Sequence, residues 1–357
     1  MNDFFKDLKV IELANVLAGP AVGLFFSELG ADVIKIENKL TQGDVTRSWK
    51  IPAEDKNNPS SAYFASVNWN KKSIFVDLNI PEERQLVYEL IKQTDIVISN
   101  YKYGDDVKLQ MDYESLKKIN SQLIYAQISG FGNESSRTAY DLILQAETGF
   151  MFMNGTASSG PLKMPVALID ILAAHQLKEG ILVALIKRMK TSKGSYVTAS
   201  LEQSAVASLA NQACNWLMAG HNHQPSGSLH PNIAPYGEIF ITADTKSMVL
   251  AIGNDKQFKK LCELLDCIHL ISDARFTTNT QRVIHREELF KNLQNSIKQK
   301  HSKVLLKQLI ENDVLAGIIK SVKEVFENNS LSSMILEETV DNRISKRVKT
   351  AIFKITD

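Results

Sequence analysis

The stretch LKVIELANVLAGPAVGLFFSELGADVIKIE, which runs from Leu8 to Glu37, decides the fold of this 357-residue chain. It reads as a short apolar strand, then a Gly- and Pro-bearing turn into a helix, then a second apolar strand. This order is typical of parallel sheets. The alternation continues, with further strands expected over Lys72–Leu78, Asp95–Asn100 and Gln122–Ser129. The first 130 residues therefore predict a doubly wound, Rossmann-like α/β domain.

The pattern changes in the second half of the chain. We expect a long helix from Asp170 to about Arg188 and another helix over Ser200–Ala219. The polar segment Gly220–Gly237, with three prolines and three glycines, reads as a linker. A hairpin and several helices follow as a smaller α+β unit. Near the C-terminus, Ser345–Ile355 reads as a last strand or an extended tail.

Composition sets limits on the class of protein. Lys and Arg number 41 and Asp and Glu number 40, and no polybasic block occurs, so neither nucleic acid nor a membrane surface is expected as a partner. No segment approaches the ~18 uncharged apolar residues of a membrane span, and the acidic first residues do not resemble a signal peptide. The three cysteines fit neither a zinc pattern nor a disulfide framework, which favours the cytoplasm.

Several common motifs are absent. The early glycines fall at Gly19, Gly23 and Gly30, so the dinucleotide fingerprint is missing, as is a phosphate loop with lysine. No Gly-x-Ser-x-Gly elbow occurs. The pair His221 and His223 lacks a further ligand at helical spacing, so we expect no metal and no redox cofactor. Lysines near predicted strand ends could hold a phosphate or simply be solvated; they are Lys71, Lys72, Lys102 and Lys108.

Asp170 stands out because it lies inside the apolar run Val166–Ala174. Asp is seldom buried without a partner. One interpretation is that Asp170 caps the helix that follows it, and helix caps are common. The other is that Asp170 is a nucleophile kept out of bulk water. From this stretch alone we favour the cap, although a helix N-terminus stabilises negative charge in either case.

Many separated segments together resemble the family III CoA-transferases. They follow the family's order over about residues 8–260 and include LKVIELANVLAGPAVGLFFSELGADVIKIE, GDVTRSW, NWNKKSIFVDL, ISNYKYG, LIYAQISGFG, AYDLILQAETG, ALIDILAAHQLKEGILVALIKRMKTSKGSYVTASL, HPNIAPYGEIF and AIGNDKQF. The resemblance implies a large α/β domain built from residues 1–220 and 330–357, a small domain over 221–329, and an interlocked homodimer. The family's nucleophilic aspartate falls on Asp170.

The resemblance also implies coenzyme A, carried as an acyl-CoA, and a carboxylic acid as substrates. The HPNIAPYGEIF and GNDKQF segments look most like the branch that uses succinyl-CoA. Positions that match the CoA-binding residues of the family, or could replace them, are Val16, Leu17, Ala18, Lys39, Lys72, Val76, Asn100, Tyr101, Lys108 and Arg137, with Tyr140 at the substrate. Leu17 replaces a glutamine of the formyl-CoA transferases, which weakens an oxalate-specific reading.

Two alternatives remain open from the sequence. The same fold hosts α-methylacyl-CoA racemases, which need a His and an Asp on opposite faces of the α-carbon. Tyr140 stands near the place of that histidine, and a tyrosine with a reference pKa near ~10 is a poor base at neutral pH. A CoA-binding relative without catalysis is the second alternative, because Asn38 and Asn79 stand where relatives carry basic residues.

Overall fold

The computed structural model describes residues 3–340 and 343–356. The chain forms two compact units. The first comprises the described parts of Met1–Met151, Lys163–His223 and Ser333–Asp357, and the second comprises Phe152–Leu162 and Gln224–Ser332. The short segment Phe152–Leu162, which falls inside the range expected for the large domain, thus belongs to the second unit.

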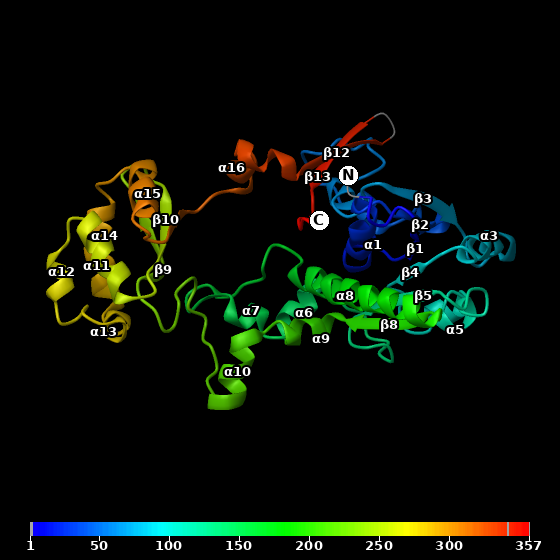
Figure 1. Cartoon of the computed structure of the whole chain (residues 1–357), viewed down its shortest axis with the longest axis horizontal. Coiled ribbons are helices and arrows are strands. Elements are labelled where there is room, and N and C mark those ends of the chain that lie inside the picture. Colours follow the sequence, from blue (N-terminus) through cyan, green and yellow to red (C-terminus); the bar gives the residue numbers. More distant parts are fainter. Residues whose placement is uncertain (1–2, 341–342, 357) are drawn as a thin grey trace. The chain divides into compact units, whose positions relative to one another are not determined.

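The first unit is built on a six-stranded parallel sheet in the order β3-β2-β1-β4-β5-β8, which confirms the predicted α/β class (Figure 1). The strands are β1 (Lys9–Leu13), β2 (Asp32–Asn38), β3 (Lys71–Val76), β4 (Ile96–Ser99), β5 (Ile124–Ser129) and β8 (Ser195–Ser200). The order reverses between β1 and β4, because β2 and β3 continue on one side and β5 and β8 on the other. Ligands of such sheets bind outside the carboxyl ends of the strands at this switch point.

Helices cover both faces of the sheet. Its central strands β1, β4 and β5 are almost entirely buried, whereas the edge strand β3 is mostly exposed. Val10 of β1 belongs to the core under α1 (Ala18–Glu28) and α8 (Leu168–Thr191), together with Val22 and Ile181. Ile11, the next residue along β1, packs in the opposite core under α3 (Pro81–Ile91). Shorter helices of this unit are α2 (Ala62–Ala65), α4 (Asp105–Lys108), α5 (Tyr113–Leu116), α6 (Asp141–Glu147), α9 (Leu201–Ala207) and α10 (Ala210–Ala219); α7 (Phe150–Met153) spans the boundary with the second unit.

One predicted helix is wrong. The sequence suggested a continuous helix over Ser200–Ala219, but α9 ends at Ala207 and α10 begins at Ala210. The hydroxyls of Ser204 and Ser208 donate to the carbonyl four residues earlier, a bond that often bends helices, and Ala210 has a φ of +49°.

The C-terminal segment returns to the first unit. Strands β12 (Ile335–Val340) and β13 (Arg343–Val348) form an antiparallel hairpin. Arg347 pairs with Glu28 of α1 at 2.5 Å, and the backbone N–H of Ala351 donates to the same carboxylate at 2.6 Å. The tail therefore lies beside α1, with Glu28 as its anchor (Figure 1).

The second unit holds a three-stranded antiparallel sheet in the order β11-β10-β9 and a layer of helices. Its apolar core gathers Phe240, Leu250, Phe258 and Leu293, among others. The strands are β9 (Tyr236–Ile241), β10 (Ser247–Ala251) and β11 (Ala316–Ile318), and the helices are α11 (Asp255–Leu264), α12 (His269–Ser272), α13 (Asn279–Ile284), α14 (Arg286–Ile297), α15 (Ser302–Glu311) and α16 (Val322–Phe326). None of the helices formed by residues 3–340 and 343–356 is long and apolar enough to cross a membrane.

Candidate active site

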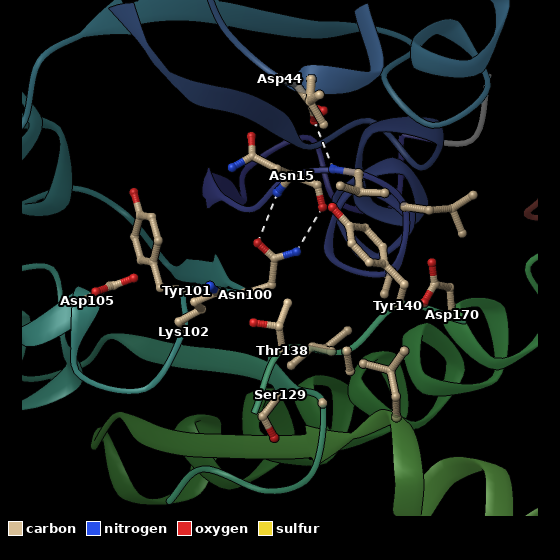
Figure 2. A pocket seen from close by; sticks show the side chains of 18 of the residues that line it. Asn15, Asp44, Asn100, Tyr101, Lys102, Asp105, Ser129, Thr138, Tyr140 and Asp170 are labelled. Atoms are coloured by element: carbon tan, nitrogen blue, oxygen red, sulfur yellow. Dashed lines mark hydrogen bonds between the residues drawn. The ribbon is translucent and has the colours of Figure 1, made fainter. Parts of the chain in front are cut away.

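A cavity of about 1040 Å³ opens at the carboxyl edge of the parallel sheet in the first unit. The loops that follow β1, β2, β4 and β5 all contribute residues to its wall. Helix α8 contributes Asp170 (Figure 2). Parallel strands bring these loops together because all their carboxyl ends meet at one edge. The cavity lies at the switch point of the strand order, where a ligand is expected.

Asp170 lies in the first turn of α8 but does not cap it, so the cap interpretation is wrong. The N-cap residue is Ala167, which supplies no side-chain bond. Asp141 of the preceding helix serves this helix end instead, because its Oδ1 accepts the backbone N–H of Ile169 at 2.8 Å. Asp170 is only 8% exposed, and its carboxylate has no hydrogen-bond or ion-pair partner within the described part of the chain.

The surroundings of Asp170 favour its neutral form. Burial, followed by the negative charge of Asp141, raises the pKa of Asp170 from 3.8 to about 7. A buried carboxyl without a positive partner shifts in this direction because the charged form is poorly solvated. When such a carboxylate ionises, its oxygens are poorly solvated, and a poorly solvated carboxylate is a stronger nucleophile than one in water.

Asp141 is fixed in turn by Gln145 of its own helix. The Nε2 of Gln145 donates to Asp141 Oδ2 at 2.6 Å, and its Oε1 accepts the backbone N–H of Met164 at 2.8 Å. Gln145 is 1% exposed. These bonds tie α6 to the start of α8 and hold the backbone that carries Asp170.

Next to β1, the buried charged side chains of Glu12, Lys35, Asp44 and Lys71 each have an ion-pair partner. Lys35 contacts Glu12 at 2.9 Å and Asp44 at 3.1 Å, and Lys71 contacts the other oxygen of Glu12 at 2.7 Å. Burial opposes the charged form of Lys35, but Glu12 and Asp44 outweigh it and raise the pKa of Lys35. Burial also acts against Asp44, yet Lys35 and two bonds from Thr46 lower the pKa of Asp44.

This charge cluster fixes α1 closely against the sheet. Lys71 Nζ donates to the carbonyl oxygen of Pro20 at 2.8 Å. A Cβ on Gly23 would lie 2.0 Å from Glu12 Oε2, so only glycine allows this approach. The first turn of α1, which faces the cavity, is thereby placed by charges that lie beneath it.

The structure brings most of the expected site residues together. Eight of them line the cavity: Val16, Leu17, Ala18, Asn100, Tyr101, Arg137, Tyr140 and Asp170. Tyr140 is 54% exposed and immediately precedes α6. Arg137 pairs with Glu147 at 2.5 Å and covers the ring of Phe131, so its guanidinium is already partly engaged.

Four expected residues do not line the cavity. Lys39 pairs with Glu83 at 3.0 Å, and Lys108 pairs with Asp105 at 3.1 Å. Val76 is 3% exposed and packs in the core under α3. Lys72 stands near the start of β3, at the amino edge of the sheet, where it pairs with Asp32. Lys72 is thus distant from the edge where ligands of a parallel sheet bind, which is the carboxyl edge.

Other residues in or near the cavity were not among the positions matched to the family's site. Lys56 and Lys102 line the cavity, and the ammonium group of neither has an ion-pair or hydrogen-bond partner in the described ranges. Tyr63 of α2 lies near the acids, since burial and then the charges of Asp170, Asp141 and Asp44 raise the pKa of Tyr63 to about 12. The sequence indicates Lys102 as one of the lysines near predicted strand ends that could hold a phosphate, but no pattern in the sequence marks Lys56 or Tyr63.

None of the described residues that line the cavity is a histidine. Within the part of the chain that the structure describes, no group of three or more His, Cys, Asp or Glu side chains is placed to hold a metal ion. The ionisable side chains that line the cavity include the acids Asp44, Asp105 and Asp170 and the basic residues Lys56, Lys102 and Arg137.

Comparisons with known proteins agree with this geometry. The profile described as CoA-transferase family III matches residues 5–355. The succinate–glutarate CoA-transferase of Agrobacterium fabrum is 38% identical over 354 residues, which cover 97% of this chain and 88% of that protein. The succinyl-CoA:glutarate CoA-transferase of Mus musculus is 34% identical, with 90% and 73% covered. The crystal structure of a CAIB/BAIF family protein from Brucella suis superposes with a TM-score of 0.88 at 39% identity, covering 99% of this chain and 93% of that one.

Proposed function

Because the chain belongs to CoA-transferase family III, we propose that it moves CoA from succinyl-CoA or a similar donor to a small dicarboxylic acid through a covalent intermediate on Asp170. The observation that carries the proposal is the state of Asp170, a buried carboxylate without a partner at the wall of a large cavity. The names of the relatives support succinate and glutarate as the class of acid.

The reaction needs only bonds that a carboxylate can make. An oxygen of Asp170 attacks the thioester carbon, the C–S bond breaks, and CoA leaves as thiolate, which gives a mixed anhydride. The thiolate then attacks the aspartyl carbonyl carbon and releases the first acid, so CoA is held as a thioester on Asp170. The acceptor carboxylate reverses the two steps. Desolvation of Asp170 makes the first attack faster than in water.

The phosphates of CoA require positive charge at the rim of the cavity. We propose Lys56 and Lys102 for this role, because both line the cavity and the ammonium group of neither has a partner among the described residues. Arg137 can contribute while it remains paired with Glu147. Lys39, Lys72 and Lys108 are less suited, since none of the three lines the cavity and each is already paired with a carboxylate.

A homodimer is part of the proposal. Helix α10 has no buried residue among the ten that form it, and Trp216, Leu217 and Met218 are exposed on it. On α8, Val183 and Met189 are also exposed. Apolar surface of this kind marks a protein interface. Light scattering should give twice the mass of the chain, and a monomer at micromolar concentration would contradict this part of the proposal.

The proposed compartment is the cytoplasm. All three cysteines are free thiols, and Cys262 and Cys267 are buried in the second unit. Reduced cysteines are usual in that compartment. Alkylation of the three thiols in protein taken directly from cells under denaturing conditions would test this assignment.

The central experiment traps the intermediate. The protein is incubated with succinyl-CoA, quenched with hydroxylamine, and measured by intact mass and peptide mapping. We expect a hydroxamate on Asp170 and new thioesters when glutarate is added. Asp170→Ala should form neither, while the matched variant Asp32→Ala, at the opposite edge of the sheet, should form both.

The same experiment separates the alternatives. A protein that binds CoA but gives neither adduct nor new thioester would be a binding relative without catalysis. Deuterium uptake at the α-carbon of a 2-methylacyl-CoA in heavy water, without any acceptor acid, would indicate a racemase. Either result would end the transferase proposal for Asp170.

A further inference from the structure

The turn that joins β1 to α1 is held in an unusual conformation. Its residue Val16 has a φ of +71°, although a β-branched residue rarely adopts a left-handed backbone. Such strain persists only where the surrounding structure enforces it, and it gathers at functional sites. Two side chains from other parts of the first unit enforce it here (Figure 2).

Asn100 clamps the residue before Val16. Its Oδ1 accepts the backbone N–H of Asn15 at 3.0 Å, and its Nδ2 donates to the backbone carbonyl of Asn15 at 2.8 Å. Because Asn100 follows β4 and Asn15 follows β1, these two bonds join the strand ends on either side of the switch point. The amide is thus engaged with backbone on both its oxygen and its nitrogen.

Asp44 holds Val16 itself from the loop after β2. Its Oδ2 accepts the N–H of Val16 at 3.0 Å. Asp44 cannot easily move, since it also contacts Lys35 at 3.1 Å and accepts the N–H and the hydroxyl of Thr46 at 3.0 and 2.8 Å. The charge cluster beneath α1 is therefore connected directly to the strained residue.

The residues that follow the turn face the proposed reaction. Leu17 and Ala18 line the same cavity as Asp170, and their backbone N–H groups have no acceptor in the described ranges. The turn packs too tightly to shift, because a Cβ on Gly19 would lie 2.4 Å from the Cβ of Ala14. The position of Leu17 and Ala18 relative to Asp170 thus depends on Val16 keeping its left-handed conformation.

We infer that Asn100 and Asp44 are positioning residues for the proposed transfer, which hold Asn15–Ala18 in the one conformation that places the thioester against Asp170. This inference rests on the proposed function. Neither side chain needs to touch the substrate, since both act through backbone atoms. It differs from the expectation that Asn100 binds CoA directly.

The decisive variant is Asn100→Asp, which keeps the size of the side chain but replaces the Nδ2 donor with an oxygen that repels the carbonyl of Asn15. We expect kcat to fall by about 10–100-fold, because a misplacement of about 1 Å can cost that much. The dissociation constant for CoA, measured by calorimetry, should rise by less than about 5-fold, which allows for the new negative charge near the phosphates of CoA and stays below the loss in kcat. Amide hydrogen exchange at Asn15 and Val16 should become faster in the folded variant.

The matched control is Asn120→Asp. Asn120 Nδ2 also bridges backbone carbonyls, those of Ile91 and Thr94 at 3.1 and 2.8 Å, but it lies away from the cavity lining. This variant should lose stability while kcat stays within about 2-fold of the wild type. Equal losses of kcat in the two variants would reduce Asn100 to a general structural role and overturn the inference.

Two further results would overturn the inference. One is an unchanged kcat in Asn100→Asp, and the other is CoA affinity that weakens in step with the loss of activity, which would mean direct contact. Failure of the proposed function is distinguishable, because it would appear in the wild-type protein as the absence of both adduct and thioester exchange.

Discussion

Asp170 and Asp44 line the same cavity as buried carboxylates, 8% and 2% exposed, yet their environments act in opposite directions. Burial and Asp141 raise the pKa of Asp170 to about 7. Burial opposes the charge of Asp44 as well, but Lys35 and Thr46 overcome it and lower the pKa of Asp44. The depth of burial therefore does not decide the protonation state; the set of partners does.

The two acids therefore suit different roles within one cavity. Asp44 has its charge satisfied on all sides and holds a loop and a strained turn in place. Asp170 is buried without a partner, at a cost in stability, and in the proposed reaction its free oxygens attack the substrate. Functional sites commonly lower stability in this way. We therefore expect that charged groups with ion-pair partners hold the site in shape, and that charged groups without partners bind or attack the substrate.

The largest effect is expected from Lys35→Met, which removes the cation that pairs with Glu12 and Asp44. Removal of one member of a buried ion pair typically costs about 3–5 kcal/mol, because the remaining charges lose their compensation. Urea unfolding monitored by circular dichroism should show this loss. The control Lys72→Met removes a lysine whose side chain is 71% exposed, and should change stability by less than about 1 kcal/mol. Equal effects of the two variants would contradict the contrast.

Asp170→Asn should instead stabilise the protein at alkaline pH. The folded-state pKa of about 7 lies above the ordinary 3.8, so the folded state binds more protons between these values and loses stability as the pH rises through them. At about 1.4 kcal/mol per pKa unit, the ionised group costs about 4 kcal/mol above pH 7. Unfolding free energies of wild type and variant should differ by about this amount at pH 8 and converge near pH 4.

Asp44→Asn provides the matched comparison, since the pKa of Asp44 is lowered. This variant should be destabilised at pH 8, with a loss that shrinks as the medium is acidified through the ordinary pKa of an aspartate. If both asparagine variants shifted stability in the same direction, the partner sets would not explain the difference between the two acids.

The parallel sheet could be predicted from the sequence because its signal is local. Each strand of the first half is a short apolar run bounded by polar residues, and the helix over Pro81–Ile91 begins with proline at its first position. The break between α9 and α10 could not be predicted, because it depends on hydroxyl-to-carbonyl bonds and a left-handed Ala210 that no periodicity reveals.

The candidate site likewise combines features that the sequence shows locally with features that depend on distant residues. Asp170 could be singled out as an acid inside an apolar run, but whether it caps its helix depends on Asp141, which lies 29 residues earlier and takes the N–H of Ile169. The partners of Lys35 and Lys71 likewise lie on other strands and loops. Sequence patterns report which residues share a face of one element, while charge pairing is decided between elements.

A smaller effect is expected for Lys102, whose ammonium group we propose binds a phosphate of CoA. Lys102 lines the cavity without a described partner, so Lys102→Ala should raise the KM for the acyl-CoA by about 5-fold, the loss of roughly 1 kcal/mol from a solvent-exposed contact to a phosphate. Steady-state kinetics would measure it. Lys108→Ala is the paired control, because Lys108 is held by Asp105, and its KM should stay within about 2-fold. The reverse ranking would favour the expectation from the family resemblance.

The smallest effect concerns Asp141, whose charge acts on Asp170 after burial does. Asp141→Asn removes that charge but can still accept the N–H of Ile169, so the pKa of Asp170 should fall. Only the ionised acid attacks the thioester, and the rate of adduct formation should therefore rise with pH to a plateau near pH 7 in the wild type and at lower pH in the variant. Rapid-quench measurements from pH 5 to 9 give both midpoints. A midpoint that does not move would mean that burial alone sets the pKa, and that Asp141 serves only to hold the start of α8.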